Sequence, residues 1–239
     1  MRTKTLLIAA AALAAGIMAS SAQTYSANIV GYTTSVYPGG NNYSLVVPTV
    51  GVTNGPAESL FPCLQPGDNL LIWTPGVGYA IYSWAGVGQN GAGGNWYDPN
   101  LNPLSSPTLH AGQAVFYQNA QGQPETNTFA GTVQLTNTVT LPGGNNYSLV
   151  GMTPPVGGLI DSTNFNLPLQ AGDNVLIWTP GVGYAIYSWA GVGQNGAGGN
   201  WYDPNLNPLS SPSVLVGQGF FYQNSQTGAE TWTNNITVQ

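Results

Sequence analysis

Two short segments carry the residue types that bind carbohydrate, each following a glycine-rich stretch. They are Asn95, Trp96, Tyr97, Asp98 and Asn100 in the first segment, and Asn200, Trp201, Tyr202, Asp203 and Asn205 in the second. An aromatic face can stack on a sugar ring while neighbouring amides and carboxylates bond to its hydroxyls. We therefore expect two equivalent ligand sites, which together would gain avidity on a polymer. The alternative is that each tryptophan folds back and covers its own domain.

The same segments contain the start of a calcium-binding loop. Oxygen-bearing side chains stand at positions 1, 3 and 5 of each, namely Asp98, Asn100, Asn102 and Asp203, Asn205, Asn207. The remainder of the loop does not fit, because Pro103 stands where glycine is needed and Leu109 where glutamate is needed. Aspartate and asparagine beside proline also form turns through their own side chains. Calcium is thus the one cofactor that the sequence suggests, and a simple turn is the alternative interpretation.

Paired carboxylates are the third candidate chemistry. Three acidic positions recur in the two halves of the chain, as Asp68 and Asp173, Asp98 and Asp203, and Glu125 and Glu230. Glu58 and Asp161 have no aligned counterpart. A glycosidase needs two carboxylates about 5 to 10 Å apart across a sugar. The local sequence of Asp68 and Asp173, directly after glycine, instead indicates turn residues.

Residues for nucleophilic or nucleotide chemistry are scarce. His110 is the only histidine, and Leu215 occupies its position in the second half. Residues 86–91 and 191–196 match the pattern G-x-G-x-x-G, but more glycines follow instead of the helix whose N-terminus would hold a pyrophosphate. We therefore assign no catalytic residue and do not expect an enzyme.

Basic side chains are confined to Arg2 and Lys4, at the start of the chain. Nucleic acid is excluded as a partner, because binding it requires cationic groups that displace counterions. Attraction to anionic membrane surfaces fails for the same reason. The partners that remain are a polysaccharide or another copy of this chain, since little charge repulsion opposes self-association.

A tandem repeat organises the chain. Residues 67–107 recur as 172–212 with one difference in 41 positions, Leu70 against Val175. Apolar and aromatic runs alternate with Pro-Gly and Asn-Gly turns, which predicts strands at 29–37, 43–47, 70–73, 79–84, 114–118 and 126–134. The sequence therefore predicts an all-β protein with two tandem β-sandwich or barrel-like repeats of about 100 residues. An arrangement in which the two copies share sheets is the alternative.

The first 22 residues have the layout of a signal peptide. A basic start precedes an apolar run at 6–18, and small residues end at Ala22. The apolar run is short for a membrane span of about 20 residues. We predict cleavage after Ala22, repeat 1 over 23–131 and repeat 2 over 132–239. The cleaved chain would be secreted to the extracellular space, the cell surface or the periplasm, without membrane insertion.

The complete layout resembles a group of short secreted proteins of Verrucomicrobia-like bacteria. The resemblance is carried by an aromatic start at 25–32, the Tyr-Ser-Leu-Val segments after Pro-Gly-Gly, paired Gly-Asp-Asn and Ile-Trp motifs, and a closing Thr231-Trp232-Thr233. It implies secretion and a two-unit β layout, and no shared activity comes with it. This chain departs from the group in its near-identical central blocks and in its lack of basic residues.

These features favour a secreted, non-catalytic structural or adhesive protein of the cell surface or extracellular matrix. A bivalent carbohydrate-binding protein that uses the Trp96 and Trp201 loops is the second hypothesis. A glycan-active hydrolase ranks third.

Overall fold

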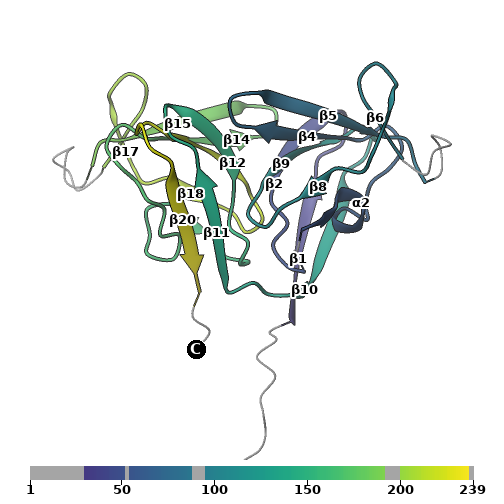
Figure 1. Ribbon diagram of the computed structural model, residues 1–239, viewed down its shortest axis with the longest axis horizontal. Helices are drawn as coiled ribbons and strands as arrows, with labels where there is room; N and C mark the ends of the chain where they lie inside the picture. The colour runs from purple at the N-terminus through teal and green to yellow at the C-terminus, as the bar shows by residue number, and fades with distance from the viewer. Residues whose placement is uncertain (1–29, 52–53, 88–94, 192–199, 237–239) are drawn as a thin grey trace, which may run out of the picture.

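The computed structural model describes residues 30–51, 54–87, 95–191 and 200–236, and its regular structure is almost entirely β. Figure 1 shows two lobes side by side, one built from the first half of the chain and one from the second. The predicted signal peptide lies outside the described residues, as does most of each G-x-G-x-x-G loop. Among the described residues, no helix is long and apolar enough to cross a membrane. The all-β, two-repeat prediction is therefore confirmed.

The first lobe contains ten strands and one short helix. They are β1 (Val30–Tyr37), β2 (Asn42–Val46), β3 (Gly55–Pro56), α2 (Ala57–Leu60), β4 (Asn69–Thr74), β5 (Gly78–Trp84), β6 (Trp96–Tyr97), β7 (Pro103–Leu104), β8 (Thr108–Leu109), β9 (Val115–Asn119) and β10 (Glu125–Thr132).

The second lobe repeats these strands in the same order, without the helix. They are β11 (Thr136–Leu141), β12 (Asn146–Val150), β13 (Gly158–Leu159), β14 (Asn174–Thr179), β15 (Gly183–Trp189), β16 (Trp201–Tyr202), β17 (Pro208–Leu209), β18 (Ser213–Val214), β19 (Phe220–Asn224) and β20 (Glu230–Asn235).

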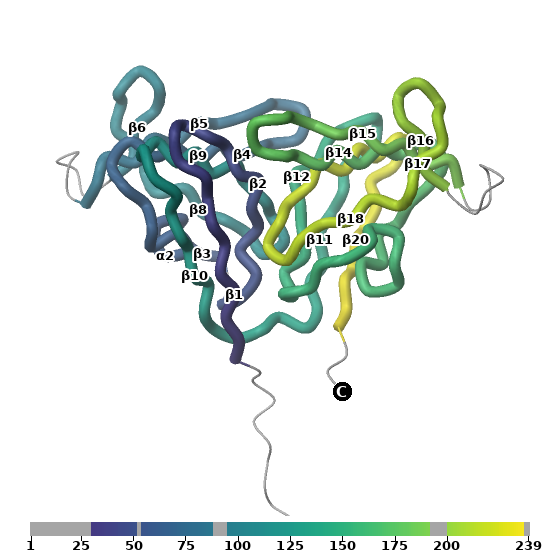
Figure 2. The backbone as a smooth tube through the Cα atoms, turned by 180° about the vertical axis from the view of Figure 1, so that it is seen from behind, coloured from purple at the N-terminus to yellow at the C-terminus, as the bar shows by residue number. Residues whose placement is uncertain are grey.

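Each lobe has one six-stranded antiparallel sheet and two small two-stranded sheets. The large sheet has the order β2-β9-β4-β5-β6-β7 in the first lobe and β12-β19-β14-β15-β16-β17 in the second. The ribbons β1–β10 and β11–β20 descend from the large sheets toward the end of the molecule where the chain passes between the lobes (Figure 2). All six strands predicted for the first repeat are present, with small differences at their ends.

Each large sheet buries one face in the core of its own lobe. In the first lobe Leu70 and Ile72 of β4 point into a core that also holds Trp84, Trp96 and Tyr117. Successive side chains on a strand face opposite sides, so Leu71 and Trp73 point the other way. They pack against a third cluster, in which residues of both lobes meet.

The lobes join through pairs of equivalent hydrogen bonds. The amide of Val47 donates to the carbonyl of Gly217 at 2.9 Å, and the matching amide of Gly151 donates to Gly112 at 3.1 Å. The indole of Trp73 donates to the carbonyl of Tyr147 at 2.7 Å, and Trp178 donates to Tyr43 at 2.9 Å. Such reciprocal contacts define an isologous interface with a pseudo-two-fold axis. The two six-stranded sheets remain separate but are joined by these hydrogen bonds across the interface. The sequence had left open two separate repeats or two copies that share sheets, and the structure lies between these alternatives.

One close approach at this interface admits only glycine. A Cβ atom built on Gly219 would lie 2.4 Å from the Cβ of Ala114, its counterpart across the axis. We expect Gly219→Ala to lower the free energy of unfolding by about 1–3 kcal/mol through overpacking. Urea denaturation measures the change. Gly122→Ala is the matched control, because a Cβ there meets no atom within 4 Å. Equal stability of the two variants would contradict this interface.

Candidate functional site

Trp96 and Trp201 are core residues, which corrects the expectation that their rings stack on a ligand. Both side chains are 0% exposed. Trp96 packs against Trp84 with ring centroids 4.9 Å apart, and Trp201 packs against Trp189 at the same distance. The physical reason is strand alternation, which turns the first residue of β6 and β16 inward. The alternative, a tryptophan folded over its own domain, is what the structure has.

Each buried indole is held by a carboxylate that sequence comparison missed. Trp96 Nε1 donates to Glu58 Oε2 at 3.1 Å, and Trp201 Nε1 donates to Asp161 Oδ2 at 3.0 Å. Ser106 and Ser211 donate to the same two carboxylates. Glu58 and Asp161 are therefore structural equivalents, although they differ in type and lie outside the aligned blocks. The available signal was the serine that follows each of them in the sequence.

The other residues of the predicted sugar sites do not gather around the tryptophans. Tyr97 and Tyr202 point to the opposite, outer face of their sheets, where they pair with Ser83 and Ser188 and are half-buried. The carbonyls of Asn95 and Asn200 accept the amides of Ala85 and Ala190 at 2.9 Å.

The predicted calcium loop is a hydrogen-bonded turn. Asp98 Oδ1 accepts the backbone amides of Asn100 and Asn102 at 2.8 Å, and Oδ2 accepts the Asn102 side-chain amide at 2.8 Å. Asp203, Asn205 and Asn207 repeat the three bonds at the same distances. The bonds from Asn102 lower the pKa of Asp98. Amide nitrogens, not oxygens, therefore converge on the carboxylate, as the turn alternative requires.

The recurring acids Asp68 and Glu125 do meet, but a tyrosine lies between them. Tyr117 Oη bonds to Asp68 Oδ2 at 2.7 Å and to Glu125 Oε2. Asp68 is completely buried and also accepts the amides of Gln65 and Ala120. Asp173, Tyr222 and Glu230 form the same arrangement in the second lobe. The tyrosine hydroxyl therefore links the two carboxylates, and Asp68 and Asp173 are buried hydrogen-bond acceptors as well as turn residues.

The number of protons shared by Asp68, Tyr117 and Glu125 makes the stability of this cluster depend on pH. One phenol proton can serve only one carboxylate, so the second contact requires a protonated carboxyl group. Burial, together with the charge of Asp68, raises the pKa of Glu125. A raised pKa in the folded state means that this group stabilises folding fully below its ordinary pKa and loses that contribution as pH rises through the raised value.

We therefore expect Glu125→Gln to remove the loss of stability that the wild type shows as pH rises. The glutamine amide can donate a hydrogen bond at every pH, as the carboxyl group of Glu125 does only when protonated. The variant should gain stability relative to the wild type as pH rises from 4 to 8, measured by urea denaturation at each pH. Asp98→Asn is a control of opposite sign, since the lowered pKa of Asp98 makes its contribution present at neutral pH and absent in acid. A stability difference for Glu125→Gln that is independent of pH would contradict the cluster.

Two cavities related by the pseudo-two-fold axis are lined by residues of both lobes. The first inter-repeat pocket, of about 270 Å³, is lined by residues 34–37, 44–46 and 215–218 with Trp178 and Pro180. The second inter-repeat pocket, of about 280 Å³, is lined by 138–140, 148–150, Trp73, Pro75, His110, Ala111 and Gln113. Each pocket combines the ribbon and edge strand of one lobe with a hairpin and turn of the other. Sequence reasoning missed both, because their walls come from segments far apart in the chain.

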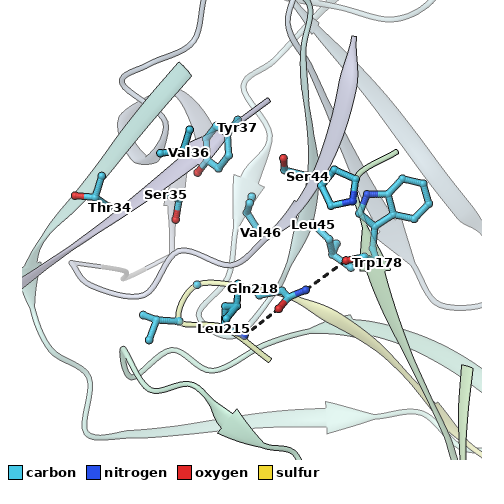
Figure 3. Close-up of a pocket in the computed structure, with 13 residues that line it drawn as sticks. Thr34, Ser35, Val36, Tyr37, Ser44, Leu45, Val46, Trp178, Leu215 and Gln218 are labelled. Carbon is cyan, nitrogen blue, oxygen red and sulfur yellow. Dashed lines mark hydrogen bonds between the residues drawn. The ribbon is translucent and has the colours of Figure 1, made fainter. Parts of the chain in front are cut away.

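One wall of the first pocket is the turn at 215–218, which is held by two hydrogen bonds of the Gln218 side chain. Gln218 Oε1 accepts the amide of Leu215 at 2.9 Å, and its Nε2 donates to the carbonyl of Trp178 at 3.3 Å. Figure 3 shows these two bonds, with Ser44, Val46 and Tyr37 on the opposite side of the pocket. The pocket is therefore preformed, with one half-buried indole, aliphatic side chains and several hydroxyls.

Comparison with known protein families, curated proteins and solved structures found no match to this chain. The chemistry of the surfaces described above is therefore the basis for a functional assignment.

Proposed function

We propose that this chain is a secreted, non-catalytic structural or adhesive protein of the cell surface or extracellular matrix, which associates with further copies of itself. The first support is the engagement of its acids. All eight take part in internal hydrogen bonds, to the two core tryptophans, to the two tyrosine clusters or within the two Asp-Asn turns. Glu58 also lines a pocket of about 460 Å³, where its carboxylate is held by bonds from Trp96 and Ser106.

The observation that carries the proposal is an exposed apolar patch beside the first inter-repeat pocket, formed by residues of both lobes. Val30, Tyr32 and Val36 point outward from β1 and are 74%, 78% and 62% exposed. Leu215 and Val216 line the first inter-repeat pocket together with Val36. We call these five residues the β1 patch. Contiguous exposed apolar side chains of this kind mark interaction sites.

The pseudo-two-fold equivalent of this surface, beside the second inter-repeat pocket, provides an internal comparison. The positions equivalent to Tyr32 and Val36 are Thr136 and Thr140, and those equivalent to Leu215 and Val216 are His110 and Ala111. The same fold therefore tolerates a polar surface at this place, so the apolar residues of the β1 patch are not required for folding. With no charged side chain in the patch, desolvation on contact costs little.

The experiment is sedimentation velocity of the mature chain, residues 23–239, over a range of concentrations. A variant with Tyr32→Thr, Val36→Thr, Leu215→His and Val216→Ala carries at the β1 patch the residues of the pseudo-two-fold equivalent surface. We expect the wild type to form dimers and the variant to remain monomeric with unchanged circular dichroism. A wild type that stays monomeric at all concentrations would overturn the proposal.

A bivalent carbohydrate-binding protein is the second candidate function. It is supported by the inter-repeat pockets, which occur twice on one chain and offer aromatic, aliphatic and hydroxyl groups. The tryptophans involved are Trp73 and Trp178, in place of the buried Trp96 and Trp201.

A further inference from the structure

We propose that the two inter-repeat pockets are a pair of equivalent binding sites, each for one uncharged sugar residue of a polysaccharide. This inference rests on carbohydrate binding, the second candidate function. It assigns that function to surfaces that only the assembled pseudo-dimer possesses.

The first argument is the chemistry of the walls. Trp178 and Pro180 supply an apolar wall to the first pocket, and Trp73 and Pro75 supply it to the second. Both tryptophans are half-buried and fixed by their indole N–H bonds to the opposite lobe. A sugar ring needs such a fixed apolar surface for its C–H face.

The second argument is the set of polar groups facing that wall. Thr34, Ser35 and Ser44 provide hydroxyls in the first pocket, and Thr138, Thr140 and Ser148 provide them in the second. Hydroxyls both donate and accept hydrogen bonds, which matches the hydroxyls of a neutral sugar. Among the described residues that line them, the first pocket contains no acidic or basic side chain, and the second contains only His110. A charged ligand would therefore find no counter-charge in the first pocket.

The third argument is an unsatisfied hydroxyl at the same place in both pockets. Ser44 is 7% exposed and Ser148 is 4% exposed, and the Oγ atom of each has no hydrogen-bond partner among the described residues. A buried hydroxyl without a partner is unfavourable, and a partner that reached it would recover the lost interaction. In Figure 3 the Ser44 hydroxyl lies within the ring of lining residues, on the side of Tyr37.

The fourth argument is size and number. Cavities of about 270 and 280 Å³ fall at the lower end of small-ligand sites and suit one sugar ring. Because the sites belong to one rigid interface, a polymer that reached both would bind more tightly than its monomer.

The chain provides its own optical reporter for the test. Of its seven tryptophans, five are at most 7% exposed, so acrylamide quenching of fluorescence reports chiefly on Trp73 and Trp178. The probes are D-glucose, N-acetyl-D-glucosamine and dextran, added to the mature chain at a concentration at which it is monomeric, because Val36, Leu215 and Val216 of the β1 patch also line the first pocket. We expect saturable protection from quenching by at least one of them. Trp73→Phe leaves the reporter of the first pocket, and Trp178→Phe leaves that of the second.

Variants at the buried serines decide whether protection arises in the pockets. Ser44→Ala in the Trp73→Phe chain, and Ser148→Ala in the Trp178→Phe chain, should each weaken binding about fivefold to tenfold, as expected for one lost hydrogen bond. Ser83→Ala in either chain is the control, because its hydroxyl bonds to Asn69 outside both pockets. Protection by none of the three probes, or protection unaffected by Ser44→Ala and Ser148→Ala, would overturn the assignment. Self-association through the β1 patch needs no sugar, so failure here leaves the proposed structural function intact.

Discussion

Trp96→Ala is expected to lower the free energy of unfolding by about 3–5 kcal/mol, the range for large aromatic residues removed from a core. Trp96 is 0% exposed, and its loss would leave a cavity beside Trp84. It would also leave Glu58 Oε2 without its indole donor. Trp201→Ala should have the same effect in the second lobe, through Asp161.

Urea denaturation followed by circular dichroism measures both changes. Tyr97→Ala is the matched control, because the side chain of Tyr97 is half-buried on the outer face of the same strand. It should cost clearly less than Trp96→Ala. Stability of the Trp96→Ala chain within about 1 kcal/mol of the wild type would contradict a core position and would restore the ligand-binding interpretation of this residue.

Asp68→Ala is the second change with a large expected effect. The carboxylate accepts the amide of Gln65 at 2.7 Å, the amide of Ala120 at 2.9 Å and the hydroxyl of Tyr117 at 2.7 Å. Removing it would leave these donors without their acceptor, at a cost of about 1–3 kcal/mol for each one that stays buried. We expect a total loss of about 3–5 kcal/mol, and the same for Asp173→Ala in the second lobe.

Tyr117→Phe separates this effect from general damage to the cluster. It removes one donor and preserves the ring, so its cost should be about 1–2 kcal/mol. Thermal and urea denaturation of the three chains should rank Asp68→Ala as the least stable. Equal stability of Asp68→Ala and Tyr117→Phe would contradict the role of the Asp68 carboxylate as the shared acceptor of three donors.

The strands and the repeat could be predicted because their signals are local. Leu70–Trp73 and Tyr79–Trp84 are apolar or aromatic runs between glycine turns, and they became β4 and β5. Alternation along a strand was also predictable, so Trp96 and Tyr97 had to face opposite sides. Which side is the core is decided by tertiary packing. For this reason the sequence left open whether Trp96 faces a ligand or folds back over its own domain.

The remaining features depend on contacts between distant segments. Glu58 reaches Trp96 across 38 residues, and its counterpart Asp161 reaches Trp201 across 40, so alignment at one fixed offset could not relate them. The inter-repeat pockets require residues such as Ser44 and Trp178, which only the pseudo-two-fold packing brings together. The confinement of basic residues to Arg2 and Lys4 predicts that nucleic acid is not a partner, but it does not show where the two lobes meet.

The central claim is that the apolar β1 patch makes this chain an assembling protein, and a reciprocal transplant tests it most directly. A variant with Thr136→Tyr, Thr140→Val, His110→Leu and Ala111→Val would place the apolar residues of the β1 patch on the equivalent surface beside the second inter-repeat pocket. One patch per chain closes a dimer, whereas two patches per chain allow contacts to continue in open assemblies. Light scattering after size-exclusion chromatography should therefore show dimers for the wild type and larger species for the transplant. Identical masses for the two chains would contradict the account.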